Sequence, residues 1–206
     1  MEERQLSGIC VGTRVWKDSD RMLRLFCEDG NIYDALARGA CKPKYKLKFA
    51  AQLFSACDYF LCPSKAGYYI LGGATFGELS FLRIAEDPEA YAAACVVCEI
   101  AAKCVLAENK RLYAETVAAL GELSAYEDAR CDLICLRMLL AAFATSGYAF
   151  TFGSDPKGSA CAAVLQAPAG NVSSVAVEES LARSMLKPLG VRFADRFEKL
   201  NSLEFL

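Results

Sequence analysis

Short apolar runs separated by polar turns make up the chain from Leu6 to Thr75. Each run has the length and the residue types of a β-strand, with apolar positions bounded by glycine, proline or charged residues. This pattern predicts five strands, which are Leu6–Val15, Met22–Cys27, Ile32–Ala37, Gln52–Leu61 and Tyr68–Ala74.

Two polar turns are expected to connect neighbouring strands. Glu28-Asp29-Gly30-Asn31 lies between the second and third runs, and its Asp-Gly pair supplies the positive φ angles of a tight hairpin. Pro63-Ser64-Lys65-Ala66-Gly67 separates the fourth run from the fifth in the same way. Five short antiparallel strands with glycine-rich corners predict a small closed barrel rather than an open sheet.

The pattern changes to a helical period after Phe76-Gly77-Glu78. Asp87 predicts the N-cap of a first helix, and Pro88 occupies its first position. Residues 151–174 have the composition of a loop. The other predicted helices are one through Leu112 and Leu123 broken near Gly121, one from Tyr126 to about Thr145, and two short ones, Val177–Leu186 and Phe193–Leu203, separated by Lys187–Gly190.

The two halves of the chain therefore differ in pattern, and they also differ in charge. We expect an α+β, multi-domain protein, with a five-stranded β-barrel domain at residues 1–78 and a helical domain at residues 79–206. Residues 1–80 contain 11 Lys+Arg and 9 Asp+Glu, whereas residues 81–206 contain 12 and 16. The predicted barrel is thus mildly basic and the helical part mildly acidic.

The composition excludes several classes of protein. Hydrophobic residues make up 54% of the chain, too many for an intrinsically disordered protein. There is no histidine, which excludes Ser-His-Asp and Cys-His catalysis and histidine zinc ligands. No Walker sequence, dinucleotide fingerprint or nucleophile elbow is present. Neighbouring carboxylates such as Asp18 and Asp20 are expected to be solvated surface residues. Because the catalytic motifs are missing as well, we expect no enzyme, no catalytic residue and no cofactor.

The 11 cysteines are scattered through predicted core segments. In a reducing compartment such residues behave as small buried apolar side chains, which is the expected role here. A zinc site from the pairs Cys95/Cys98 and Cys131/Cys135 is the alternative, although both pairs lie in helical segments without a glycine-containing knuckle. A thiol oxidoreductase is a third interpretation, and it requires an accessible cysteine of low pKa.

The sequence also predicts where the protein resides. Its start, Met1-Glu2-Glu3-Arg4-Gln5, is acidic and does not resemble a secretory signal. The longest uncharged stretch, from Gly158 to Val177, contains Pro168 and Gly170 and is read as a loop rather than a membrane helix. We expect a cytoplasmic protein without membrane contact.

The densest basic feature follows the third predicted strand. Five positive charges and no carboxylate lie between Arg38 and Lys48, and Tyr45 stands among them. In a small five-stranded Greek-key barrel this region borders the face that typically holds single-stranded nucleic acid, through cations along the phosphates and an aromatic side chain under a base. A solvated loop whose lysines aid solubility is the equal alternative. The expected contacts are Arg38, Lys42, Lys44, Tyr45, Lys46 and Lys48.

Residues nearer the N-terminus extend this basic surface. Arg14 and Arg21, with Lys17 and Arg24, are candidates for widening it, although Asp18 and Asp20 partly cancel their charge. Trp16, the single tryptophan, is placed in a polar loop. It either caps the open end of the barrel or stacks on a base.

Several of these residues resemble the bacterial RecO recombination-mediator family. In the N-terminal half, Arg14, Gly30 and the run from Ala37 to Tyr45 are similar to its motifs. Cys41 and Tyr45 depart from that pattern, since the family usually has Arg and Ser there. In the helical half the similar segments are Pro88-Glu89-Ala90-Tyr91, Arg137-Met138-Leu139-Leu140, Ser146-Gly147-Tyr148 and Leu200–Leu206.

Many members of that family carry a four-cysteine zinc knuckle soon after the Gly-Tyr. Here Cys161 is the only cysteine downstream of Tyr148, so the sequence predicts a short form without structural zinc.

The resemblance implies that the barrel of residues 1–78 has the oligonucleotide/oligosaccharide-binding (OB) fold and binds nucleic acid. It also implies a function in DNA repair and homologous recombination. A protein of this family binds single- and double-stranded DNA, anneals complementary strands and helps to load RecA on DNA covered by single-strand-binding protein. The implied partners are RecR and the acidic C-terminal tail of single-strand-binding protein, with RecA acting indirectly, and the implied location is the bacterial cytosol at the nucleoid. The alternative is a protein–protein adaptor with weak DNA affinity of its own, which the net charge of −2 favours.

Overall fold

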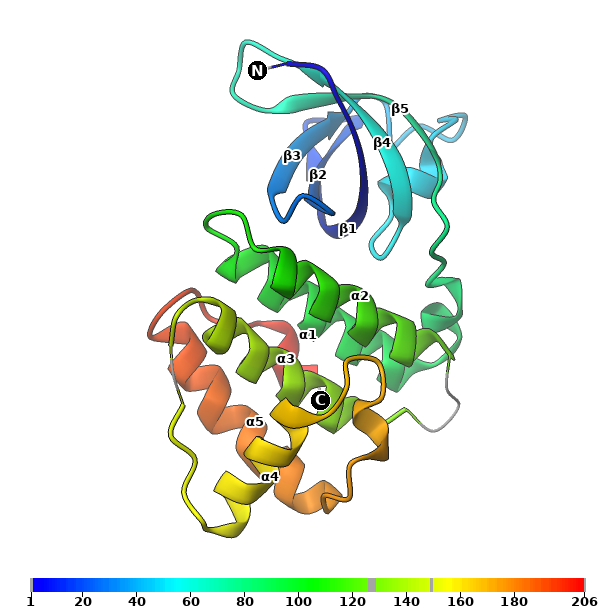
Figure 1. Ribbon diagram of the computed structural model, residues 1–206. Coiled ribbons are helices and arrows are strands. Elements are labelled where there is room, and N and C mark those ends of the chain that lie inside the picture. Colours follow the sequence, from blue (N-terminus) through cyan, green and yellow to red (C-terminus); the bar gives the residue numbers. More distant parts are fainter. Residues whose placement is uncertain (1, 126–128, 149, 206) are drawn as a thin grey trace. The chain divides into compact units, whose positions relative to one another are not determined.

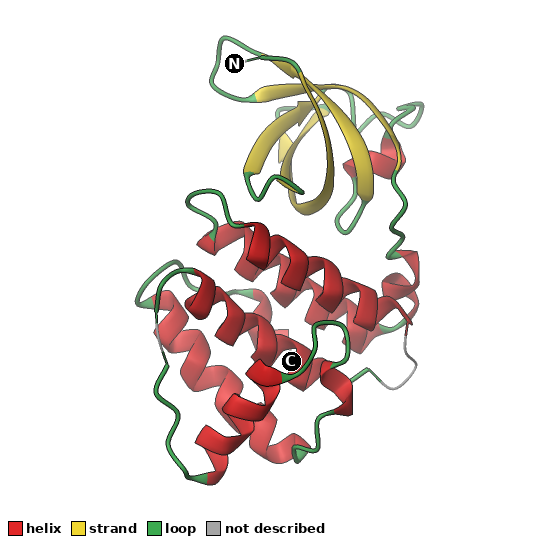
Figure 2. Ribbon diagram, in the orientation of Figure 1, coloured by secondary structure: helices red, strands yellow, loops and turns green. Residues whose placement is uncertain are grey.

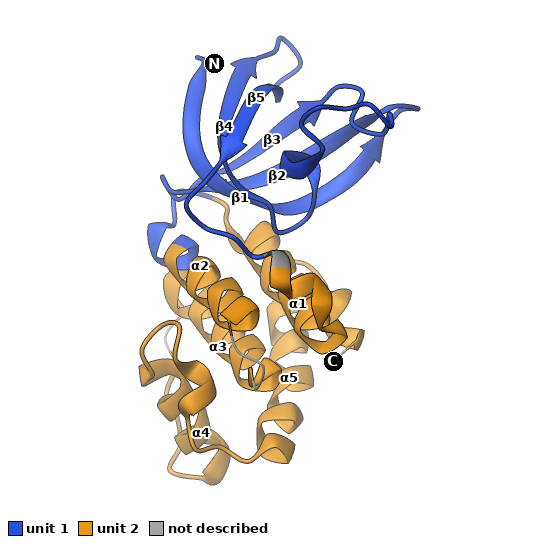
Figure 3. Ribbon diagram, turned by 90° about the vertical axis from the view of Figure 1, so that its right-hand side faces the viewer, with its two compact units in different colours: residues 1–82, 107–113 blue, residues 83–106, 114–206 orange. Residues whose placement is uncertain are grey.

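The computed structural model describes residues 2–125, 129–148 and 150–205 (Figures 1 and 2). The chain divides into two compact units (Figure 3). Unit 1 consists of Met1–Leu82 with Ala107–Tyr113, and unit 2 consists of Arg83–Leu106 with Ala114–Leu206. We describe each unit separately.

Unit 1 is a closed five-stranded barrel, which confirms the predicted OB-type fold. Its strands follow one another around the barrel in the order β1-β2-β3-β5-β4. All neighbouring strands are antiparallel except β3 and β5, which pair in parallel through Ala35 with Tyr69 and Leu36 with Ile70. The strands are β1 (Arg4–Trp16), β2 (Asp20–Cys27), β3 (Ile32–Ala37), β4 (Ala56–Pro63) and β5 (Tyr69–Phe76).

The length of β1 allows the barrel to close. Its first half pairs with β4 and its second half with β2, and the register shifts between Cys10 and Gly12. Such a bulge bends a strand and increases its twist, so that one strand can contribute to both walls of the barrel.

Alternating side chains fill the interior of the barrel. Leu23 and Leu25 on β2 and Tyr59 and Leu61 on β4 all point inward and are buried. The Tyr59 hydroxyl donates to a backbone carbonyl, with the Ala50 oxygen at 3.3 Å and the Ser55 oxygen at 3.1 Å. A buried hydroxyl requires such partners, so the Tyr59 ring can occupy the core.

A short 3₁₀ helix, η1 (Lys48–Ala51), packs on this core between β3 and β4. Its Ala50 and Ala51 are buried, and the ring of Phe49 stacks on Phe76 with 4.3 Å between centroids. The predicted fourth strand was therefore too long at its start: residues 52–55 form a turn in which Phe54 adopts a φ of 67°.

The β2–β3 turn depends on the glycine that the sequence singled out. Gly30 has a φ of 83°, and its carbonyl accepts a hydrogen bond of 2.8 Å from the Asn109 N–H. A Cβ atom at Gly30 would lie 2.6 Å from the Lys110 nitrogen, closer than real contacts allow. Gly67, in the β4–β5 turn, has a φ of 84° but nothing within 4 Å of the equivalent point.

Unit 2 is helical, and its centre is a helix that is almost completely buried. Every residue of α3 from Cys131 to Phe143 is buried. The predicted N-cap of α1 is confirmed, because the Asp87 carboxylate accepts hydrogen bonds from the N–H groups of Glu89 and Ala90. The helices are α1 (Pro88–Cys104), α2 (Lys110–Ala125), α3 (Cys131–Thr145), α4 (Pro156–Gln166) and α5 (Glu179–Ala194).

Two predicted helix breaks are wrong. α2 continues through Gly121, and α5 is one helix that contains Pro188, where the sequence predicted two helices. An internal proline costs a helix about 3 kcal/mol or more. In α5 the burial of Met185, Leu186 and Phe193 along one face offsets this cost.

The helix boundaries correct two further predictions. The predicted last helix, Phe193–Leu203, is not formed, because α5 ends at Ala194 and only the 3₁₀ turn η4 (Ser202–Phe205) follows. The predicted start of the third helix at Tyr126 lies outside the described residues, and α3 begins at Cys131.

The segment 151–174 is not the loop that its composition predicted, because it contains α4. Asp155 caps this helix by accepting a 3.2 Å hydrogen bond from the Gly158 N–H, and Pro156 occupies the first turn. The signals that start α4 are thus the same as those of α1, and the alanines and Cys161 that follow supply a small buried face.

Two buried charged side chains fasten this segment to the helices. The Arg137 guanidinium forms a two-point ion pair with Glu115 of α2, at 2.7 and 3.0 Å. It also donates to the carbonyls of Val164, Leu165 and Ala167 at the end of α4. Glu122 accepts hydrogen bonds from the N–H groups of Val172 and Ser173.

Replacing Arg137 therefore removes several interactions at once. We expect Arg137→Met to lower the free energy of unfolding by about 3–5 kcal/mol, since Glu115 loses its counter-ion and three carbonyls lose their donor. Urea denaturation measures this change. The control is the same substitution at an exposed position, Arg192→Met. Adding Glu115→Leu should recover part of the loss, and a purely additive double variant would contradict the pairing.

Alanine at Gly30 and at Gly67 separates the effect of backbone strain from that of close contact. We expect Gly67→Ala to lower the free energy of unfolding by roughly 1–2 kcal/mol, the cost of a left-handed φ for a residue with a Cβ. Gly30→Ala should lower it by more, because the added Cβ also collides with backbone atoms. Equal losses of unfolding free energy in the two variants, measured by thermal or urea unfolding, would show that the backbone around Gly30 accommodates the added Cβ without further cost.

Candidate nucleic-acid interface

The basic segment after β3 is fastened to the barrel at its start. The Gly39 N–H donates a 2.8 Å hydrogen bond to the Asp20 carboxylate, and the Cys41 N–H donates to the Ser19 carbonyl at 2.9 Å. The bond from Gly39 lowers the pKa of Asp20, which therefore stays ionised. Asp20, read from the sequence as a charge that weakens the basic surface, instead anchors the segment that carries most of it.

This segment forms one wall of a groove on the outside of the barrel. The groove has a volume of about 740 Å³. Its other wall comes from β4 and β5, beside which the segment lies in Figure 1. We call it the basic groove, and its lining residues are Arg38, Gly39, Lys42, Lys44, Tyr45, Lys46, Leu47, Phe60, Gly72, Gly73 and Ala74.

The lining of the basic groove is cationic and aromatic. It contains four cationic side chains, all of them exposed, and none of its lining residues is a carboxylate. Tyr45 is half-buried, and burial raises the pKa of its phenol, so this side chain is neutral. The groove can therefore hold an anionic ligand without losing an ion pair within the lining.

Five of the nine predicted contacts meet in this groove: Arg38, Lys42, Lys44, Tyr45 and Lys46. Lys48 is exposed at the start of η1 and does not line the groove. Arg21 is half-buried at the start of β2, on the inward-facing set that continues with Leu23. Its Nε is buried without a hydrogen-bond partner.

Arg14 and Trp16 lie elsewhere on the barrel. Trp16 ends β1 and is not in a loop, which corrects the prediction. The Arg14 guanidinium lies over its ring at 4.7 Å, and Tyr68 of the β4–β5 turn meets the ring edge at 6.3 Å. These three side chains form a separate aromatic corner where the β1–β2 and β4–β5 turns approach each other.

Six of the lining residues are not among the predicted contacts, and Phe60, Gly72 and Gly73 are the three that change the character of the groove. Phe60 projects outward from β4 and is 40% exposed. Gly73 pairs with it on β5, and Gly72 lies at the adjoining register shift. The alternation around Tyr59 and the Gly-Gly pair in a strand were the signals that could have revealed this site.

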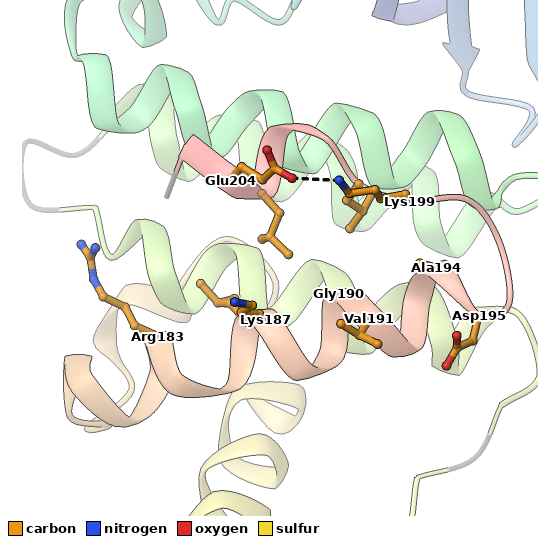
Figure 4. Close-up of a pocket in the computed structure, with 11 residues that line it drawn as sticks. Arg183, Lys187, Gly190, Val191, Ala194, Asp195, Lys199 and Glu204 are labelled. Atoms are coloured by element: carbon orange, nitrogen blue, oxygen red, sulfur yellow. Dashed lines mark hydrogen bonds and ion pairs between the residues drawn. The ribbon is translucent and has the colours of Figure 1, made fainter.

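Unit 2 has a groove of a different character. It lies between α5 and the segment that follows it, has a volume of about 620 Å³ and is lined mainly by apolar groups such as Leu186, Val191 and Leu203 (Figure 4). An ion pair of 2.9 Å joins Lys199 to Glu204 at its rim, as the dashed line in Figure 4 marks. None of the predicted site residues lines it.

Glu99 of α1 holds the outer wall of that groove. Its carboxylate accepts hydrogen bonds from the Asn201 N–H at 3.0 Å, from the Ser202 N–H at 2.8 Å and from the Ser202 hydroxyl, and it pairs with Lys103 at 2.7 Å. Burial alone would raise its pKa. The Lys103 ammonium and the Ser202 and Asn201 donors outweigh burial and lower the pKa of Glu99 to about 2.

The cysteines are mostly buried, as the sequence predicted. Burial raises the pKa of Cys131 to about 12 and that of Cys135 well above its usual value, and it also raises that of Cys95. Zinc ligation and thiol exchange both require a thiolate, which these shifts disfavour. Among the described residues, no group of three or more Cys, Asp or Glu side chains is placed to hold a metal ion.

No helix in the described ranges has both the length and the apolar character needed to cross a membrane.

The closed barrel, with a 3₁₀ helix between β3 and β4, defines an OB-fold domain, and the basic groove lies on its surface. Comparison with known proteins agrees: residues 1–74 match the family model for the N terminus of recombination protein O. The barrel of this chain is therefore similar to the N-terminal domain of the RecO family.

One relative is similar to part of this chain. A stretch of 47 residues is 45% identical to the DNA repair protein RecO of Leuconostoc citreum (strain KM20). The match covers 23% of this chain and 18% of that protein, so it spans less than a fifth of the relative. The resemblance of the helical half to the family remains a prediction.

The low pKa of Glu99 gives a pH dependence with a definite sign. A carboxylate whose pKa is lowered on folding stabilises the protein above its unfolded pKa, near 4.5, and this contribution is lost as the pH falls towards about 2. We expect the free energy of unfolding to fall over that window, and to fall less in Glu99→Gln. Urea denaturation between pH 5 and pH 2 measures both, and parallel curves would contradict the assignment.

Proposed function

We propose that this protein acts in DNA repair and recombination, and that its barrel binds DNA through the basic groove. The observation that carries this proposal is the composition of the groove: four cations and two aromatic side chains line it, and no carboxylate does. Phosphates attract the cations, and flat aromatic faces accept bases, which is the usual combination for single strands.

The proposed mechanism involves no covalent chemistry. Two complementary strands repel each other because both carry a negative charge on every phosphate. Cations in the basic groove lower that repulsion when they neutralise phosphates of strands held close together, and annealing becomes faster. If the four groove cations each neutralise one phosphate, affinity for a single strand should fall roughly 50-fold between 50 and 200 mM salt.

The proposed partners follow from the family. RecR is the first, the acidic C-terminal tail of single-strand-binding protein is the second, and loading of RecA is the result that they produce together. Binding of double-stranded DNA and a location in the bacterial cytosol, at the nucleoid, belong to the same proposal. The proposed role is that of a mediator, not an enzyme.

A protein–protein adaptor with weak DNA affinity is the second candidate. The observation that favours it is the net charge of −2, which gives little long-range attraction for DNA. Salt dependence separates the two candidates, because binding through phosphates weakens steeply with salt and apolar docking does not.

Charge reversal in the groove tests the proposal. We expect Lys42→Glu/Lys44→Glu to weaken binding of a labelled single-stranded oligonucleotide by at least about tenfold at 100 mM salt, and to lower the salt slope by about half. Fluorescence anisotropy measures both quantities. Both side chains are exposed, so the melting temperature should stay within about 2 °C of the wild type.

The matched control is Lys17→Glu/Lys65→Glu, which makes the same change in net charge. Lys17 lies in the β1–β2 turn and Lys65 in the β4–β5 turn, outside the basic groove. This control variant should weaken binding of the oligonucleotide only slightly. If the control loses affinity and the groove variant does not, DNA binds near the aromatic corner instead. If neither loses affinity, the adaptor is favoured.

A further inference from the structure

Phe60 is an apolar ring in a cationic groove, and the alternation of β4 puts it there. Tyr59 and Leu61, its neighbours along the strand, are buried in the barrel, so Phe60 has to face outward. It remains 40% exposed although Tyr45 and Leu47 line the same groove. An aromatic side chain left open among cations is available to a ligand that carries both negative charge and flat apolar faces.

The strand beside Phe60 keeps the ring accessible. Its cross-strand partner is Gly73, and a Cβ atom there would lie 3.5 Å from the Phe60 ring, in ordinary van der Waals contact with it. Gly72, which precedes Gly73 in β5, lies at the register shift, and a Cβ atom there would lie 2.9 Å from the Cys62 sulfur. Two consecutive glycines weaken a strand, and here they leave the floor of the groove without side chains.

The surrounding charges restrict what can lie on this ring. Four cations line the same groove, so the ligand is anionic. A DNA duplex meets the charge requirement, but its base faces are stacked inside and cannot reach an aromatic ring on a protein surface. A single strand offers both phosphates and free base faces, and stacking of one base on an aromatic side chain is sequence-tolerant.

We propose that Phe60 is the residue through which the basic groove prefers single-stranded over double-stranded nucleic acid, by stacking on an unpaired base above the floor formed by Gly72 and Gly73. This inference rests on the proposed function and deepens it. The cations supply affinity for any nucleic acid, and Phe60 adds affinity only where a base is unpaired.

The test compares three probes bound by the full chain: an oligo-dT strand, a duplex closed by hairpins at both ends, and an abasic strand with the same number of phosphates. We expect Phe60→Ala to weaken binding of oligo-dT by about 5- to 20-fold, the lower part of the range for base–aromatic stacking. Its affinity for the duplex and for the abasic strand should change by less than twofold. Phe60→Trp should retain the wild-type affinity for oligo-dT.

The matched control is Phe76→Ala. Phe76 is also an exposed phenylalanine of the barrel, 74% exposed on β5, but it stacks on Phe49 and does not line the groove. It should leave the affinity for all three probes unchanged. Melting temperatures of both variants verify that the barrel is intact.

Other outcomes would overturn the inference. An equal loss on oligo-dT and on the duplex would mean that Phe60 shapes the groove rather than stacks on a base. An unchanged affinity of Phe60→Ala, in a protein whose binding still responds to Lys42→Glu/Lys44→Glu, rejects this inference and leaves the proposed function standing. If the charge reversal also has no effect, both fail. Displacement of oligo-dT by poly-glutamate through a Phe60-dependent site would assign the groove to an acidic protein instead.

Discussion

Closure of the barrel is the constraint on which the rest of unit 1 depends. Because β3 pairs in parallel with β5, the chain between β3 and β4 has to return across the barrel instead of forming a hairpin. Part of that connection supplies η1, which packs on the core with Ala50 and Ala51. The remaining polar part stays outside, where Arg38 and the lysines that follow can line a groove against β4 and β5.

The same closure sets the chemistry of the groove. Each strand has one inward face, and in β4 this face requires Tyr59 and Leu61, so Phe60 is left outward next to glycines of β5. Asp20 fixes the start of the basic segment through the Gly39 N–H. One carboxylate is thus used as an anchor outside the groove, and the lining itself stays free of negative charge.

Unit 2 uses buried charge for a structural purpose. Arg137 and Glu122 have most of their hydrogen-bonding capacity filled by backbone groups of the segment 164–173, in which Val164 and Val172 are the buried residues. Truncation of such a group leaves several partners unsatisfied at once, so these residues specify one position for the segment. Glu99 acts in the same way on Asn201 and Ser202.

The sequence by itself determined the strand pattern, the turn at Gly30, the N-cap at Asp87 and the basic segment that begins at Arg38, because these follow from local periodicity, backbone preference and charge. Tertiary structure decided the rest. α5 continues through Pro188 because its buried face offsets the local cost. α4 has a local start signal in Asp155, but its end is held by Arg137 of another helix. Contrary to the prediction from the sequence, Arg14 and Trp16 do not share a surface with Lys42, whereas Phe60 lines the same groove as Lys42. The reason is that barrel closure, and not distance along the chain, determines which side chains share a surface.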